Sequence, residues 1–201
     1  GVSGGGRFGY LLFYSFGFYV SRPRAVRGVW EGGMSFHGGL LGVLLAGYLF
    51  ARKHRLGFLV LGDLLAVVTP LGLLLGRIGN FINGELWGRT TDLPWGVVFP
   101  GAGAVPRHPS QLYEAGLEGV LLLIVMLVLG RHRRAPGLLG GVFLTGYALC
   151  RMLVELVREP DAHLGILAGG MTMGQWLSLP MVVIGLGLIA HARRTSGAGM
   201  R

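Results

Sequence analysis

Residues 76–89 read GRIGNFINGELWGR and directly follow a long apolar run, Phe58 to Leu75. These fourteen residues include two arginines, one glutamate, two asparagines and four glycines. Glycine lets a backbone approach another chain or a ligand closely, and arginine offers a planar fork of donors that suits a phosphate. A turn that only joins two membrane helices does not need so many polar groups. We therefore interpret this stretch as the floor of a site.

The composition is typical of a polytopic membrane protein. Hydrophobic residues make up 52% of the chain and charged residues only 13%, whereas soluble domains carry about 25% charged residues. The mean hydropathy is +0.60. Many of the 38 glycines lie inside apolar runs, where they suit close helix packing in lipid. We expect an all-α fold, namely a polytopic integral membrane helical bundle.

About six membrane spans can be drawn with a window of about 20 residues. They cover residues 1–20, 36–51, 57–76, 112–130, 137–157 and 173–191, with a long loop at 77–111 and a tail at 192–201. No internal repeat is visible, so we expect a single membrane-embedded domain. Because the chain opens at Gly1 without a methionine, we expect that its beginning is missing.

The net charge of +9 fits membrane topology better than nucleic-acid binding, so we expect no nucleic acid among the partners. Basic clusters at residues 52–55, 131–134 and 193–194 follow alternate spans, and the positive-inside rule places them in the cytoplasm. Three arginines in the 21–35 loop oppose this orientation, but the three clusters outweigh them. The long loop at 77–111 is then extracytoplasmic, and the tail is cytoplasmic.

Several ionisable residues are predicted at one depth, toward the outer leaflet. Arg151 and Glu155 are four residues apart on one helix face, and Tyr147 stands one turn earlier. His37 and Arg77 lie at the matching ends of other spans. Each has a structural alternative, such as an ion pair that holds the bundle, a hydrogen bond at a helix start, or an arginine that reaches the interface. Buried ionisable residues are costly in lipid, so their coincidence favours a shared site.

Such a site suits a lipid phosphate. Arg77 and Arg151, with Arg89 or Arg158 as further candidates, would hold the phosphate and neutralise a leaving phosphate ester, while a His or Glu takes a proton. The chain has no HExxH, GxSxG or P-loop motif, which argues against metalloprotease, acyl-serine and nucleotide chemistry. Two alternatives remain: a transporter of anionic lipid or solute, and a scaffold held by buried ion pairs. Asp63 and the lone Cys150 are more readily structural, the cysteine as a buried and inert thiol.

Residues 76–89 also resemble the signature of the bacterial phosphatidylglycerol–prolipoprotein diacylglyceryl transferase family. Four further blocks resemble that family in its own order: GGMSFHGGLLG (32–42), RHPSQLYEAGLEG (107–119), GYALCRMLVELVREPD (146–161) and MGQWLSLPM (173–181). The family has seven membrane helices and a cytoplasmic C-terminus. The resemblance therefore implies that the first helix is absent from this chain.

The resemblance implies an activity: transfer of the diacylglyceryl group from phosphatidylglycerol to the lipobox cysteine of preprolipoproteins, the first step of lipoprotein maturation. The partners would be phosphatidylglycerol, lipobox peptides and membrane lipids, and the location the bacterial cytoplasmic (inner) membrane, with the active site toward the outer leaflet. The acceptor supplies the nucleophile, so no metal or organic cofactor is expected.

The resemblance also implies site residues. The catalytic candidates are His37, Arg77, Glu85, Tyr147, Arg151 and Glu155. The substrate-binding candidates are Arg77, Asn80, Asn83, Gly88 and Arg151. His37 is our preferred general base, with Glu85 and Glu155 as alternatives.

Overall fold

The computed structural model describes residues 36–132, 134–160 and 168–198, so the predicted first span at 1–20 lies outside the described residues. The chain divides into two units, residues 1–61 and 62–201, which we describe separately. Across the described ranges the structure is mostly helical and contains no strand, only three isolated β-bridges. The expected helical class is therefore confirmed.

The described part of the first unit consists of α3 (Phe36–Lys53) and the first turn of α4 (Phe58–Asn83). Arg52 and Lys53 occupy the last turn of α3, where positive charge is favourable. The connecting turn places Arg55 at a φ of 55° and packs Tyr48 edge to face against Phe58, with ring centroids 6.2 Å apart. This unit thus holds the predicted 36–51 span and its basic end.

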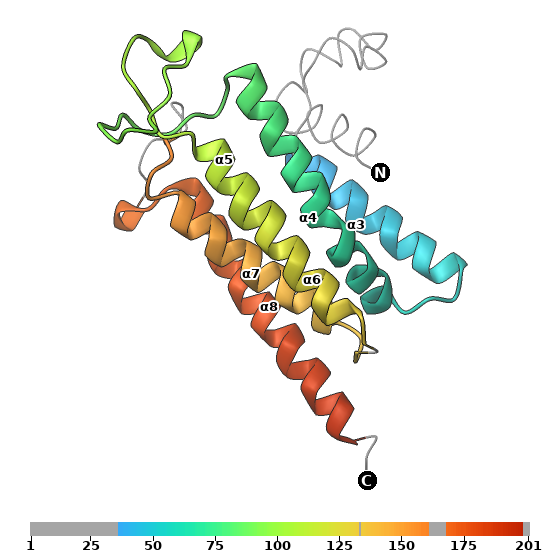
Figure 1. Ribbon diagram of the computed structural model, residues 1–201. Coiled ribbons are helices and arrows are strands. Elements are labelled where there is room, and N and C mark those ends of the chain that lie inside the picture. The colour runs from blue at the N-terminus through green and yellow to red at the C-terminus, as the bar shows by residue number, and fades with distance from the viewer. Residues whose placement is uncertain (1–35, 133, 161–167, 199–201) are drawn as a thin grey trace, which may run out of the picture. The chain divides into compact units, whose positions relative to one another are not determined.

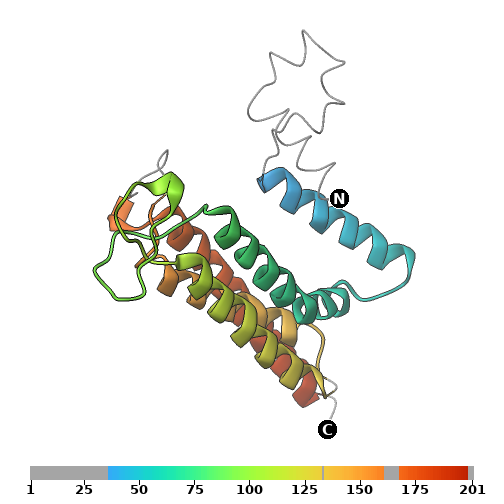
Figure 2. The same cartoon turned by 45° about the horizontal axis from the view of Figure 1, so that its top comes forward.

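The second unit holds the remaining helices. A continuous helical segment, Ser110–Gly130, comprises α5 (Ser110–Glu114), the π-helical turn η4 (Ala115–Leu121) and α6 (Leu122–Gly130). It is followed by α7 (Leu138–Val154) and α8 (Met173–Ala198). Figures 1 and 2 show α7 and α8 side by side along most of α7, with α5 and α6 next to them.

Glycines bring the helices of the second unit close together. A Cβ added to Gly119 of η4 would lie 2.7 Å from the Cβ and 2.9 Å from the Cα of Leu74 in α4. A Cβ on Gly141 of α7 would lie 2.7 Å from the carbonyl oxygen of Gly185 in α8. Small residues at crossings let helix backbones approach in lipid, where the hydrophobic effect does not drive helices together. These contacts therefore set the distances between the elements that carry the site.

Asp63 of α4 caps the start of α7. Its Oδ2 accepts a hydrogen bond from the backbone N–H of Gly137 at 2.7 Å, and its Oδ1 accepts one from Gly140, also at 2.7 Å. The first amides of a helix have no partner within the helix, and a carboxylate near them is stabilised by the helix dipole. Asp63 therefore has the structural role expected for it, as a link between two helices.

In the part of the chain that the structure describes, three helices are long and apolar enough to cross a membrane: Phe58–Asn83, Ser110–Gly130 and Met173–Ser196, with mean hydropathies of 2.3, 2.1 and 1.7. The 17 residues of α7 form a shorter apolar helix. Large apolar side chains such as Leu75 and Val183 are exposed on these helices, whereas Glu114 and Glu118 are fully buried. Apolar groups outside and charges inside are what a lipid environment favours. The chain is thus a helical membrane protein, while the count of six spans stays a prediction.

The structure moves two predicted boundaries. The long loop was expected from residue 77, but α4 continues to Asn83, so half of the signature is helical. It ends at Gly84, whose φ is 65°, with backbone bonds from Gly84 N to Phe81 O and from Glu85 N to Asn80 O. This Schellman arrangement needs a residue that tolerates the left-handed region, and glycine provides it. The predicted tail at 192–201 is also helical as far as Ala198.

Candidate active site

Six charged side chains meet at one end of the second unit, and we call them the charged cluster. Its members are Arg77, Glu114, Glu118, Arg151, Glu155 and Arg158. They come from α4, from α5 and η4, and from α7 with the residues that follow it. Segments far apart in the sequence therefore build this group together.

Glu114 contacts all three arginines. Its Oε1 accepts hydrogen bonds from Arg151 Nη1 and, at 3.1 Å, from Arg158 Nη1. Its Oε2 lies 3.1 Å from Nε of Arg77. The side chain has no solvent exposure, so these contacts compensate a carboxylate that would otherwise be very costly to bury. Glu114 is the centre of the cluster.

Two further carboxylates complete the pairing. Arg77 Nη2 donates to Glu118 Oε2 at 3.3 Å, and Arg151 Nη2 lies 2.5 Å from Glu155 Oε1. Three arginines and three glutamates leave the cluster formally neutral. Ionic groups within apolar helices are expected to be paired in this way. The arrangement is consistent with burial at membrane depth.

The side chains of Arg77 and Arg151 are more exposed than those of the carboxylates between them. The side chains of Arg77 and Arg151 are 16% and 14% exposed, whereas those of Glu114 and Glu118 are 0% exposed. The carboxylates are thus fully enclosed, whereas the arginine side chains keep a small exposed fraction. An arginine has five donors, so donors remain for an anion.

Hydrogen-bonding capacity inside the cluster is not fully used. Nε of Arg77, Oε2 of Glu114 and Oε1 of Glu118 are buried and have no hydrogen bond. Arg77 Nε and Glu114 Oε2 are close enough for an ion pair, but the alignment does not give a hydrogen bond. A buried donor without an acceptor is unfavourable, and an acceptor such as a phosphate oxygen can relieve it. Arg77 Nε meets Glu114 only as an ion pair, without an aligned hydrogen bond.

Residues 84–89, the second half of the signature, are held next to the charged cluster by hydrogen bonds. The Gln111 side chain donates to the carbonyl oxygen of Glu85 at 2.6 Å, and Ser110 Oγ donates to that of Leu86 at 3.0 Å. The backbone N–H of Arg89 donates to Val157 O at 2.9 Å. The loop is therefore bound both to the start of α5 and to the segment after α7, from which Glu114 and Arg158 enter the cluster.

Gly88 occupies a position without room for a side chain. A Cβ there would lie 2.6 Å from the Cβ of His108 and 2.7 Å from the carbonyl oxygen of Val157. Its N–H donates to His108 O at 2.9 Å, and it forms an antiparallel bridge with Arg158. The structure therefore gives Gly88 a packing role at the point where three segments cross. The substrate-binding role that we predicted for it stays a prediction.

The structure brings together three of the predicted catalytic residues, Arg77, Arg151 and Glu155. Tyr147 lies one turn before Arg151 on α7, within electrostatic range of Glu118. Their roles in catalysis remain predictions.

The other predicted residues are placed elsewhere. Glu85 and Asn83 are exposed and hydrogen-bond each other, Asn83 Nδ2 to Glu85 Oε1 at 3.4 Å. Asn80 lies in the last turn of α4 and is half-buried. His37 belongs to the first turn of α3 in the other unit, and its side chain lies outside the described residues. Within the second unit, the described contacts do not bring Glu85, Asn83 or Asn80 into the charged cluster.

Sequence reasoning missed the two central carboxylates. Glu114 and Glu118 stand four residues apart where an apolar span begins, the same spacing as Arg151 and Glu155. Two buried acids on one face required partners, and this was the signal available. The described ranges contain no group of three His, Cys, Asp or Glu side chains that could hold a metal ion.

Comparison with known proteins identifies close relatives. The family model described as prolipoprotein diacylglyceryl transferase matches residues 1–191. A phosphatidylglycerol–prolipoprotein diacylglyceryl transferase from Idiomarina loihiensis is 55% identical over 199 residues, 99% of this chain and 75% of that protein. Proteins of the same name from Geobacter sulfurreducens and Bordetella avium are each 57% identical over 198 residues, 98% of this chain, which cover 76% and 75% of those proteins.

Proposed function

This chain belongs to the prolipoprotein diacylglyceryl transferase family, and we propose that it transfers the diacylglyceryl group of phosphatidylglycerol to the lipobox cysteine of preprolipoproteins. The resemblance found in residues 76–89 is thereby confirmed. The transporter alternative is not favoured, since the relatives are named as transferases. The structural observation that carries the proposal is the group of three arginines around Glu114.

The charged cluster is the proposed binding site for the phosphodiester. The guanidinium groups of Arg77 and Arg151, whose side chains are partly exposed, would donate to its oxygens, while Glu114 keeps both in place. Charge-assisted hydrogen bonds from planar guanidinium groups are the strongest that a protein offers a phosphate. Asn80, Asn83 and Gly88 remain proposed as further donor-binding positions through the signature that contains them.

The proposed reaction forms one bond and breaks one. The acceptor thiol gives its proton to a base, and the thiolate attacks C3 of the diacylglyceryl group. The bond between C3 and the phosphate ester oxygen breaks, and glycerol phosphate leaves with the electron pair of that bond. The arginines would stabilise the second negative charge that then develops on the phosphate. Because the acceptor supplies the nucleophile, the enzyme needs only to bind, orient and accept a proton.

Glu155 is poorly suited to act as the base. Its Oε1 pairs with Arg151 at 2.5 Å and its Oε2 accepts a hydrogen bond from Thr172 at 2.6 Å, so both oxygens are engaged. An acceptor already bound to a cation and to a hydroxyl has less capacity for a thiol proton. We retain His37 as the proposed base, with Glu85 as the alternative.

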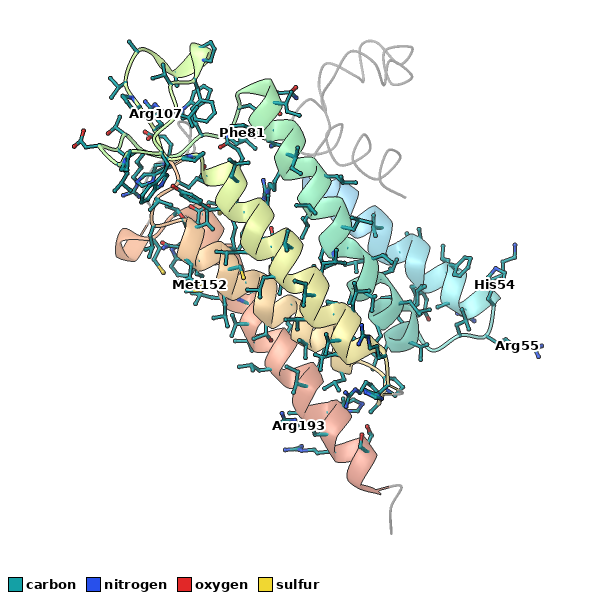
Figure 3. All side chains as sticks on the ribbon, viewed as in Figure 1. His54, Arg55, Phe81, Arg107, Met152 and Arg193 are labelled. Atoms are coloured by element: carbon teal, nitrogen blue, oxygen red, sulfur yellow. The ribbon has the colours of Figure 1, made fainter. Side chains whose placement is uncertain are left out.

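We further propose six membrane spans in this chain, with the site toward the outer leaflet of the bacterial cytoplasmic membrane. Within the second unit, Arg193 and the end of α6 lie away from the loop that holds Arg107 (Figure 3). The basic residues Arg131 and Arg134 follow α6. If these positive ends face the cytoplasm, the charged cluster faces outward.

A lipidation assay tests this function. Membranes that contain the chain are incubated with a lipobox peptide and vesicles of phosphatidylglycerol, and the peptide is analysed by mass spectrometry. We expect the cysteine to gain the mass of one diacylglyceryl group. A peptide with serine in place of the cysteine should gain nothing, and neither should the cysteine peptide with vesicles of phosphatidylethanolamine alone. No gain with phosphatidylglycerol, while the protein is inserted, would refute the proposal.

A further inference from the structure

The side chain of Thr172 joins the start of α8 to the charged cluster. Its Oγ1 donates to Glu155 Oε2 at 2.6 Å and accepts from the backbone N–H of Gln175 at 3.3 Å. In return, the backbone N–H of Thr172 donates to Oε1 of Gln175 at 3.1 Å. This reciprocal pair is a capping box, which fixes where a helix begins. Thr172 is only 5% exposed, so its hydroxyl is committed to these partners.

Glu155 is seated against the first turn of α8. A Cβ added to Gly174 would lie 2.5 Å from Oε1 of Glu155. The absence of a side chain at Gly174 therefore makes room for the carboxylate. A helix N-terminus favours a nearby negative charge, since its amides carry partial positive charge. Glu155 is 3% exposed and is therefore held by the hydroxyl of Thr172, the helix start and an arginine.

The orientation of Arg151 depends on the position of the Glu155 carboxylate. One end of its guanidinium pairs with Glu114 and the other with Glu155, so moving either carboxylate turns the planar fork. Glu114 is fixed by three arginines, whereas Oε2 of Glu155 accepts a hydrogen bond from the hydroxyl of Thr172. This hydrogen bond acts together with the contacts of Glu155 Oε1 to Arg151 at 2.5 Å and to Arg158 Nε at 3.8 Å, so that Glu155 is held in the rotamer that meets Arg151.

We propose that Thr172 is a positioning residue for the transfer reaction, acting on Arg151 through Glu155. The inference rests on the proposed function, because it assigns a role within the same site. A helix cap alone would make Thr172 purely structural. The two roles differ in what they require: a cap needs only an acceptor, whereas holding Glu155 needs a donor.

Three substitutions separate the two roles. Thr172→Ser keeps both the acceptor and the donor. Thr172→Asp keeps a good cap, but it offers no donor and places a second carboxylate against Glu155. Thr172→Val keeps the shape and loses both functions. We expect the Ser variant to retain transfer within about twofold, and the Asp and Val variants to lose up to about a hundredfold, the scale of a misplacement of about 1 Å.

A second set of variants combines the same three substitutions with Glu155→Gln and tests whether their effect passes through Glu155. An amide at position 155 removes the repulsion and can donate to a carboxylate, so the Asp variant should lose no further activity there relative to Ser. Each variant is made in the full chain, and its insertion and thermal stability in membranes are measured with the lipidation rate for phosphatidylglycerol.

The outcomes are distinct. Equal activity of the Asp and Ser variants in a chain that transfers lipid would overturn the inference and leave Thr172 as a cap. An Asp penalty that persists unchanged with Glu155→Gln would overturn it as well, since the effect would not pass through Glu155. An unsubstituted chain that transfers nothing would instead overturn the proposed function. Loss with Asp, retention with Ser, and relief by Glu155→Gln together support the assignment.

Discussion

Replacement of Arg77 by alanine should abolish most lipid transfer while the protein still inserts into the membrane. Arg77 pairs with Glu114 at 3.1 Å and with Glu118 at 3.3 Å, and its removal leaves the charged cluster with two arginines and three glutamates. The cluster then carries a net charge of −1 and faces a phosphodiester of the same sign. A phosphate would lose an attractive guanidinium and meet an uncompensated carboxylate.

The expected magnitude follows from Coulomb's law for a guanidinium in direct contact with a phosphate. A guanidinium about 4 Å from a phosphate contributes about 4 kcal/mol at an effective dielectric constant of about 20. Since about 1.4 kcal/mol corresponds to a factor of ten in rate, Arg77→Ala should slow transfer by about a thousandfold. Arg77→Lys keeps the charge but loses the planar fork, so we expect a loss of about tenfold to a hundredfold.

The assay is peptide lipidation in membranes of matched protein content. Arg193→Ala is the control, because Arg193 lies on α8 far from the loop that holds Arg107, and its loss should leave transfer unchanged (Figure 3). Wild-type turnover by Arg77→Ala would refute the role of the cluster in phosphate binding. Failure of the variant to insert would show that Arg77 serves the fold, and the lysine variant would then decide whether charge alone restores insertion.

Three substitutions test the packing that positions the cluster. Gly119→Ala places a methyl group 2.7 Å from the Leu74 Cβ and should cost about 1–3 kcal/mol of stability and reduce transfer. The control Gly116→Ala, whose added Cβ has no atom within 4 Å, should keep both stability and transfer. Equal thermal stability of the two variants would contradict this prediction. Gly88→Ala should disrupt the packing against His108 and Val157 and lower both stability and lipidation. The control Gly79→Ala, whose added Cβ has no atom within 4 Å, should retain stability. The two variants are compared by thermal unfolding in detergent. Asp63→Asn removes one acceptor from the start of α7 and should lower the unfolding temperature at a cost of about 1–3 kcal/mol; an unchanged temperature would show that the cap is dispensable.

The sequence predicted the helical membrane class because composition reports the environment directly. A chain with 13% charged residues and long apolar runs can satisfy its backbone in lipid only as helices or a closed barrel. It also predicted that Arg151 and Glu155 share a helix face, from their spacing, and that Arg77 lies at the same depth, from the order of the spans and the positive-inside rule. These inferences needed only local periodicity and the distribution of charge along the chain.

Other features depend on tertiary contacts and were not predictable from spacing alone. The polar character of residues 77–83 suggested a loop, but the helix continues until Gly84 can adopt a positive φ. Glu114 was not singled out, because its importance comes from three arginines that the fold brings to it from other segments. Gly88 was read as part of a ligand site, and only the fold shows that His108 and Val157 leave no room beside it.

The neutrality of the charged cluster indicates when its arginines contribute most. The phosphodiester of the substrate carries one negative charge, and the departing glycerol phosphate gains a second as the C–O bond breaks. The carboxylates of Glu114, Glu118 and Glu155 balance the three arginines beforehand, so net attraction for the ground state is modest. The guanidinium of Arg77 then contributes more as charge develops on the phosphate than before. Substitution of Arg77 should therefore lower kcat more than it raises KM, and a raised KM with unchanged kcat would place its contribution in binding alone.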